Sequence, residues 1–293
     1  MNLALTVLQI VAPVFLLAGI GYAWVKLGFE YRIQFVTRLA MTLSVPCLIF
    51  TALMKMELDP GALTALALAT IAAYGAVTLA AALVVRWMRL DRRTYLAPVI
   101  FGNTGNIGLP LALFAYGETG LGYAVVVFAI MAVWSFTFGV YLVSGAGNPL
   151  KVLQEPMVAA TLLGALFLWQ GWQTPPFLTN TLELVGQMAI PLMLITLGVA
   201  VARLNPAGLG RAALISVIKL ALCFELAWLA ATLFRLEPTA FGVLVVQVST
   251  PVAVTSYLLA EKYGADADSV AALVVASTLI AVPALPAILA LLL

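Results

Sequence analysis

Two short stretches of this sequence place polar, hydrogen-bonding side chains inside otherwise apolar segments. The first, NTGNIGLP, runs from Asn103 to Pro110, and the second, QVSTP, runs from Gln247 to Pro251. Their amides and hydroxyls carry no permanent charge, but they can donate hydrogen bonds to an anion such as a carboxylate. Each stretch ends on a proline, and the first also contains two glycines, so a helix is expected to break at each place.

A helix that breaks inside a membrane leaves backbone groups without partners, and each such group in hydrocarbon costs several kcal/mol. A half-helix that starts at a break presents free N–H groups and about half a positive charge, which attract an anion. The candidate substrate-binding residues are Asn103, Thr104, Asn106, Gln247, Ser249 and Thr250, and the candidate break residues are Gly105, Gly108, Pro110 and Pro251. The alternative interpretation is that these glycines and prolines serve close helix packing.

The rest of the chain is apolar enough to cross a membrane repeatedly. Of its 293 residues, 64% are hydrophobic and 9% are charged, and the mean hydropathy is +1.13. A soluble domain would carry about 25% charged residues. Charges and turn residues divide the chain into ten expected spans, near 5–26, 33–54, 61–87, 93–116, 119–143, 152–171, 178–202, 208–234, 238–260 and 267–291. The sequence therefore predicts an all-α integral membrane protein with ten transmembrane helices in the lipid bilayer.

The lysines and arginines between these spans predict the orientation. No positive charge precedes Lys26, so the first span is expected to be a membrane helix and not a cleavable signal. One set of loops holds Lys26, Arg32, Arg38, Arg86, Arg89, Arg92, Arg93, Lys151, Arg203, Arg211 and Lys262, and the opposite set holds Lys55 and Arg235. Because positive residues favour the cytoplasmic side, both termini are expected on the periplasmic side.

The two halves of the chain resemble each other when it is cut near Gly147. Pro46 and Pro191 occupy matching places in the second and seventh spans, and a Tyr-Gly pair with an acidic turn follows the break in both the fourth and the ninth. Five spans per half is an odd number, so the halves must enter the membrane from opposite sides. The sequence thus predicts an inverted repeat of residues 1–147 and 148–293, with a site where the halves meet.

Two charged side chains fall inside the eighth span. Glu225 lies ten residues from Arg235, which places it roughly 15 Å deep and near the membrane midplane. A charge at this depth indicates a function, here coupling to a proton, and Lys219 is a second candidate for coupling. The alternatives are a protonated or hydrogen-bonded carboxyl between helices and, for Lys219, local anchoring.

Several function classes are disfavoured by what the sequence lacks. It has no histidine, no HExxH zinc motif and no P-loop, so neither an enzyme nor a primary pump is expected. Cys47 and Cys223 both fall within apolar spans and are not expected to pair or to bind a metal. No cofactor, metal site or nucleic-acid partner is expected, whereas a proton or sodium ion remains as a coupling ion. The leading hypothesis is a secondary carrier for a small organic anion; a channel or a ligand-sensing receptor is the alternative.

Three segments resemble one family of carriers. NTGNIGLPLALFAYG resembles the fourth helix of the auxin efflux carrier (PIN-like) family, VVQVSTPVAVTSYLLAEKYG its ninth helix and RLAMTLSVPCLIF its second. The resemblance covers nearly the whole chain and is to the bacterial members, with a fold like that of the bile acid/sodium symporters. It implies ten helices in an inverted five-plus-five repeat, with helices 4 and 9 crossing at Pro110 and Pro251. It also implies a scaffold domain of spans 1, 2, 6 and 7, a transport domain of spans 3–5 and 8–10 that moves like an elevator, and a homodimer formed through the scaffold.

The resemblance further implies residue roles and a substrate class. Asn103 matches the asparagine that meets the substrate carboxylate in the plant carriers, and Gln247 matches a glutamine just before the second crossover. Asn106 departs from the plant pattern, where an apolar residue is usual, and only about GAGNPLKV remains of the long loop between the plant halves. These departures weaken auxin itself as the substrate. A mono- or dicarboxylate such as malate or malonate, or an auxin-like acid, is expected, moved across a bacterial cytoplasmic membrane.

Overall fold

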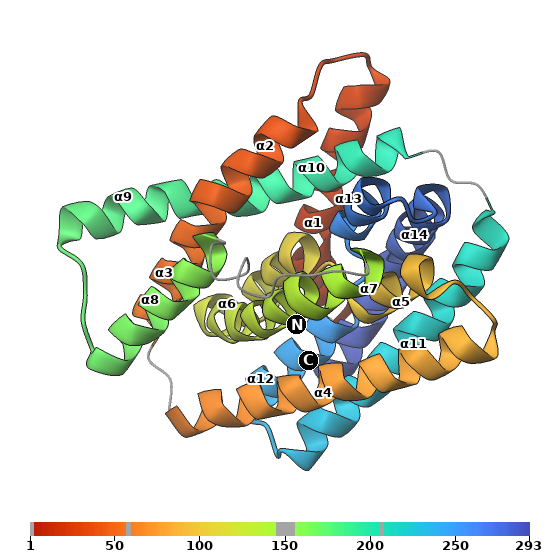
Figure 1. Ribbon diagram of the computed structural model, residues 1–293. Coiled ribbons are helices and arrows are strands. Elements are labelled where there is room, and N and C mark those ends of the chain that lie inside the picture. Colours follow the sequence, from red (N-terminus) through yellow and green to blue (C-terminus); the bar gives the residue numbers. More distant parts are fainter. Residues whose placement is uncertain (1–2, 57–59, 145–155, 205–207) are drawn as a thin grey trace.

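The computed structural model describes residues 3–56, 60–144, 156–204 and 208–293, and its regular elements there are helices (Figure 1). The first half contains α1 (Leu3–Lys26), α2 (Ile33–Leu39), η1 (Ala40–Ser44), α3 (Val45–Met54), α4 (Pro60–Trp87), α5 (Arg92–Ile100), η2 (Thr104–Gly108), α6 (Leu109–Trp134), η3 (Ser135–Gly139) and α7 (Val140–Ser144), where η marks a π-helical turn. The second half contains α8 (Pro156–Gln170), α9 (Pro176–Gln187), α10 (Ala189–Arg203), α11 (Leu209–Leu233), α12 (Pro238–Val248), α13 (Val254–Tyr263) and α14 (Ala267–Leu292). The predicted boundary at Gly147, the GAGNPLKV segment and Lys151 lie outside the described residues.

Seven helical stretches of the described chain are long and apolar enough to cross a membrane, judged by length and composition. One of them, Thr104–Ser144, has 41 residues and bends at Gly117, where φ is 66° and ψ is −157°. The apolar helices α8 and α12 are shorter than a full span. These features confirm a multi-pass, all-helical membrane protein. The count of ten spans stays a prediction, because it divides the long stretch in two and adds α8 and the interrupted α12–α13 pair.

Two helical paths are interrupted. Residues 101–103 separate α5 from η2, and residues 249–253 separate α12 from α13. Both interruptions are buried, so their backbone groups need partners within the protein.

The two interruptions supply these partners to each other. Gly102 and Val252 form an isolated antiparallel bridge, in which the Asn103 amide donates to the Pro251 carbonyl at 2.7 Å. We call this pair of segments, 101–103 with 249–253, the crossing. It joins positions about 150 residues apart in the chain and holds the two helix breaks against each other.

The first break does not lie at its predicted proline. Pro110 was expected to open the helix, but it follows Asn103, the last residue of the break, by seven positions and lies in the first turn of α6. The π-helical turn η2 precedes it, and there the Gly108 amide donates to the Asn103 carbonyl five residues back, at 3.3 Å. The wider turn and the N-terminal position accommodate the proline ring and its missing donor, so the helix continues. Pro251, in contrast, lies within the second break.

The helices pack in two main sets around this crossing. α1 packs most closely on α10, and α3 packs on α8 and α9, whereas α11 packs on α4, α12 and α14, and α12 packs on α6. Figure 1 shows α2 and α10 toward the top, α3, α8 and α9 toward the left, and α4, α11 and α12 toward the bottom and lower right.

The contact between α1 and α10 brings two backbones together. A Cβ added to Gly21 would lie 2.0 Å from the Ile195 carbonyl oxygen, and one added to Gly198 would lie 1.7 Å from the Ala18 carbonyl oxygen. Glycine is therefore required at both positions by the space between the helices, as in other close helix contacts in membranes.

Gly21→Ala tests this contact. The new methyl group must push α10 away, so we expect a loss of stability of about 1–3 kcal/mol or more, as for other overpacked sites. Gly19→Ala on the same helix is the matched control, because nothing lies within 4 Å of a Cβ there. Thermal unfolding of both variants in detergent makes the comparison, and equal melting temperatures would contradict the described α1–α10 contact.

Candidate functional site

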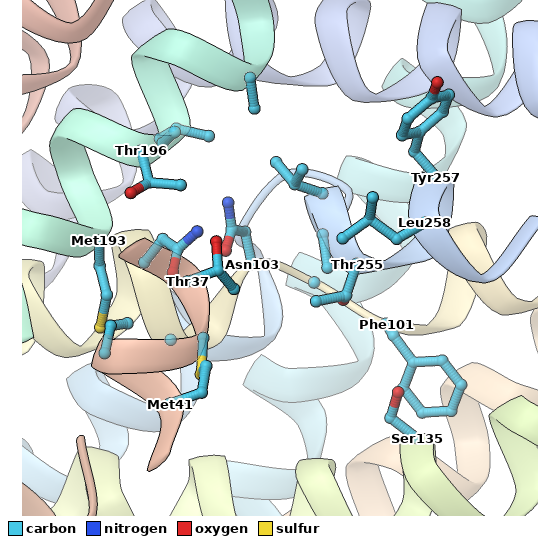
Figure 2. Close-up of a pocket in the computed structure, with 18 of the residues that line it drawn as sticks. Thr37, Met41, Phe101, Asn103, Ser135, Met193, Thr196, Thr255, Tyr257 and Leu258 are labelled. Atoms are coloured by element: carbon cyan, nitrogen blue, oxygen red, sulfur yellow. The ribbon is translucent and has the colours of Figure 1, made fainter. Parts of the chain in front are cut away.

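A cavity of about 420 Å³ lies beside the crossing. Its walls come from both breaks and from α2, η1, η2, α6, η3, α8, α10 and α13. Figure 2 shows Asn103 in the cavity, with Thr37 and Thr196 on one side of it and Thr255 and Tyr257 on the other. The cavity is thus shared between segments from both halves of the chain.

Asn103 is the polar group that the crossing fixes in this cavity. Its side chain is 5% exposed, and its Nδ2 atom has no hydrogen-bond partner among the described residues. Its backbone amide is already held by Pro251, so the position of the side chain is set by the crossing. A buried donor without a partner is costly, and a ligand with an acceptor atom would remove that cost. Asn106, half-buried one turn later, lines the same cavity.

The charge around the cavity has one sign. Arg203 is the charged side chain among the described residues that line it, and no lining residue is a carboxylate. Arg203 is exposed and donates to the Tyr31 carbonyl, which places the guanidinium at the cavity's edge. Most other walls are apolar, with methionine side chains at positions 41, 131, 157 and 193. A cationic edge, neutral donors and an apolar body suit an organic anion.

The structure brings some of the predicted binding residues to the cavity and places the others elsewhere. Asn103 and Asn106 line the cavity together with Gly105. Thr104 is fully buried and does not line it, and its hydroxyl has no partner among the described residues. Gln247 is also fully buried, and it lies against η2.

The contact between Gln247 and η2 depends on a glycine. A Cβ on Gly108 would lie 2.0 Å from the Gln247 Oε1 atom, so only a hydrogen leaves room for the amide. The Gln247 Nε2 atom donates to the Ala124 carbonyl at 3.4 Å. Gln247 therefore joins α12 to η2 and α6 and does not face the cavity.

Ser249 and Thr250 belong to the crossing but do not line the cavity that contains Asn103. They line a small cavity together with Lys219, whose Nζ atom donates to the Thr250 carbonyl at 2.9 Å. Lys219 is 2% exposed, whereas Glu225 lies on the exposed face of the same helix. Lys219 and Glu225 are six residues apart, so at about 3.6 residues per turn they lie on different faces of the helix. Glu225 thus points away from the crossing, and of the two coupling candidates only Lys219 contacts it.

Sequence reasoning did not find several residues of the cavity. Thr37 and Thr196 come from the second and seventh spans, close to the prolines that aligned the two halves, and a hydroxyl in an apolar span was the available signal. In the sequence, Arg203 indicated only the orientation of the chain in the membrane. Tyr257 carried no signal, because its place at the cavity depends on how α13 leaves the second break.

The tightness of the crossing can be tested with a double mutant. A Cβ on Gly102 would lie 2.3 Å from the Thr250 Oγ1 atom, so Gly102→Ala should destabilise the protein by about 1–3 kcal/mol. Thr250→Ala alone loses the hydrogen bond from Oγ1 to the Gln247 carbonyl, 2.7 Å long, which is worth about 1 kcal/mol. Because Thr250→Ala also removes the clashing atom, the double variant should lose less stability than the sum of the single losses. Thermal unfolding of all four proteins measures this, and strict additivity would show that the two segments do not touch.

An all-helical membrane protein with a cavity built on paired helix breaks has the architecture of a membrane transporter. The family model described as "Membrane transport protein" matches residues 6–155 and 147–289, which together span nearly the entire chain. The chain belongs to this family, and its resemblance to the auxin efflux carriers is confirmed.

Known relatives are transporters by name. The chain is 26% identical over 294 residues to an "Uncharacterized transporter" of Methanothermobacter thermautotrophicus, covering 95% of this chain and 96% of the relative. It is 25% identical over 199 residues to a "Putative malonate transporter" of Rhizobium meliloti, covering 62% of this chain and 61% of the relative. An "Uncharacterized transporter" of Methanocaldococcus jannaschii is 24% identical over 192 residues, with 61% of each chain covered.

Proposed function

We propose that the protein is a secondary carrier that moves a small organic anion across a bacterial cytoplasmic membrane by alternating access at the crossing. The observation that carries this proposal is the buried, unpartnered amide of Asn103 in a cavity whose described lining has no carboxylate. Membership of a transport family supports a carrier and not an enzyme. The printed name of the Rhizobium relative adds malonate to the acids worth testing.

The cavity favours a carboxylate as the substrate class. Asn103 and Asn106 supply neutral donors at one end, and most of the remaining surface is apolar. A volume of about 420 Å³ admits a dicarboxylate such as malonate or malate and also a monocarboxylate with an apolar body. The transported class is therefore a mono- or dicarboxylate whose carboxylate accepts from Asn103.

Two cavities along the same helices support alternating access. The cavity beside Asn103 meets residues 33–41 of the second predicted span and residues 193–204, which are the second part of α10 and the residue that follows it. A second cavity of about 780 Å³ meets residues 48–56 and 183–191, farther along the same two predicted spans, and its other wall is α6. We infer that α1–α3 and α8–α10 form the scaffold and that the remaining helices carry the crossing past it, like an elevator.

Reconstituted vesicles test the function directly. We would measure uptake of labelled malonate, malate, benzoate and phenylacetate into proteoliposomes at a clamped membrane potential. A carrier gives saturable uptake and counterflow, a channel gives flux without counterflow, and a receptor gives neither. The proposal includes no resident cofactor, and imposing a proton or sodium gradient one at a time shows whether either ion accompanies the anion. No flux of any of these acids would contradict the proposal.

Asn103→Ala should weaken binding of the transported carboxylate. A hydrogen bond to a charged group is worth about 1.5–3 kcal/mol, so the affinity should fall roughly 10- to 150-fold. Asn103→Asp should bind more weakly still, because it places a negative charge against the anion. The measurement is the half-saturating concentration for counterflow, made on variants that stay monodisperse after purification.

Asn180→Ala is the control for this series, because Asn180 is exposed on α9 and does not line the cavity. It should bind like the parent. If Asn103→Ala and Asn103→Asp also bind like the parent, the carboxylate site lies elsewhere and Asn103 serves only the backbone of the break.

The proposal places both termini on the periplasmic side and joins two copies through the scaffold helices. The orientation rests on the distribution of lysine and arginine between the two sets of loops. Single cysteines at Asn2 and Leu293, in a background without Cys47 and Cys223, should react with an impermeant thiol reagent added outside intact spheroplasts. Reaction only after permeabilisation would reverse the orientation.

A further inference from the structure

Lys219 is a buried lysine without a buried carboxylate beside it. It is 2% exposed on α11, and its Nζ atom lies 2.9 Å from the Thr250 carbonyl oxygen and 3.8 Å from the Cys223 sulfur. The described residues form two ion pairs, Arg32–Glu30 and Lys55–Glu183, and neither includes Lys219. Glu225, the carboxylate nearest to it on α11, is on the exposed face.

The surroundings of Lys219 offset its charge only in part. α12 ends at Val248, just before Thr250, so the negative end of that helix lies close to the ammonium group. The small cavity beside it, lined by Ser216, Ser249 and Ser277, has a volume of about 10 Å³. This is about the space of one water molecule. A carboxylate cannot fit there, so an anion that balances Lys219 must lie elsewhere.

The crossing lines both the large cavity and the small cavity beside Lys219. The Thr250 carbonyl that accepts from Lys219 would lie 3.0 Å from a Cβ on Gly102, and Gly102 precedes Asn103. Residues 101–103 and 253 of the crossing line the large cavity, whereas residues 249–251 and Lys219 line the small one. An anion in the large cavity and the ammonium group are therefore separated by more than the roughly 4.7–4.9 Å between two paired segments. In a medium of low polarity a positive charge still attracts an anion over such a distance.

We propose that the transported anion is the counterion of Lys219, held on the opposite side of the crossing. The inference rests on the proposed function and adds the electrical role of one residue to it. Lys219 and the crossing belong to the same set of helices, so the ammonium group accompanies the bound anion as the site moves. Arg203 is on α10, in the other set, and does not accompany it.

This arrangement decides which step of the cycle carries charge. With a monocarboxylate bound, the charges of the anion and of Lys219 cancel, and the loaded site crosses the membrane as a neutral pair. The empty site returns with one positive charge. One negative charge is still moved per cycle, but the membrane potential acts on the return step. Exchange of labelled for unlabelled substrate, which uses only the loaded step, should therefore not depend on voltage.

The experiment compares exchange with net efflux in proteoliposomes containing labelled benzoate or phenylacetate, at zero and at about 100 mV set with potassium and valinomycin. In the parent, net efflux should change with voltage and exchange should not. In Lys219→Met, the loaded site carries the negative charge alone, so exchange should become voltage-dependent, by up to about 50-fold for a full charge at about 100 mV. Its half-saturating concentration should rise about tenfold or more, because the counterion is gone. With malonate as the probe, the loaded site carries one negative charge in the parent and two in the variant, so the variant responds more steeply.

Two controls separate charge from structure. Lys219→Arg keeps the cation and should keep the parent's pattern, and Lys262→Met removes an exposed lysine at the end of α13 and should change nothing. The inference is overturned if parent exchange depends on voltage as steeply as net efflux, or if Lys219→Met alters neither voltage dependence nor affinity. If Lys219→Met does not fold, the comparison of exchange with net efflux in the parent decides alone. If the parent transports no carboxylate at all, that result contradicts the proposed function itself and not only the role of Lys219.

Discussion

The hydrogen bond from the Asn103 amide to the Pro251 carbonyl is the interaction on which the rest of the site depends. Two helices that break inside an apolar protein must satisfy the backbone groups that they expose. Here each break satisfies the other through a short antiparallel bridge. The bridge keeps α5, η2, α12 and α13 in register, and it sets the position of the Asn103 side chain. The cavity exists where it does because these segments cannot separate without losing buried hydrogen bonds.

Different kinds of polar group also lie on the two sides of the crossing. On one side are neutral amides and an apolar cavity, and on the other is a buried ammonium group bound to a backbone carbonyl. A cation placed directly in the cavity would form a close ion pair with an anion and slow its release. In the arrangement that we propose, the same cation lies behind the backbone of the crossing and attracts the anion at a distance, and the contacts themselves are made by side chains that bind less strongly. This proposed geometry would let the site bind the anion and also release it.

The sequence was sufficient to locate both breaks approximately and to single out Asn103 and Asn106, because uncharged polar residues with glycine and proline are rare in apolar spans. It misplaced the first break, since Pro110 can lie in the first turn of a helix as readily as at a break, and the π-helical turn η2 has no sequence signature. The helix period correctly placed Lys219 and Glu225 on different faces of their helix, but it could not indicate which face is buried in the protein and which is exposed. In a membrane helix both the buried and the lipid-facing sides are apolar, so the periodicity that orients a helix in a soluble protein is missing. The side on which Thr250 lies could not be predicted, because an extended break has no helical period to follow. Gln247 lies on α12, where residues 242–248 are all buried, so the helix period does not distinguish its faces.

The contact between Gly108 and Gln247 is one of those that join the two halves of the chain, and a Cβ on Gly108 would lie 2.0 Å from the Gln247 Oε1 atom. If the halves descend from one duplicated ancestor, they have been free to diverge at most positions, but not at this one. A larger residue in the first half becomes acceptable only after the amide in the second half has become shorter. The contact therefore couples the two positions during evolution, because a residue larger than glycine at position 108 requires the side chain at position 247 to move or to shorten.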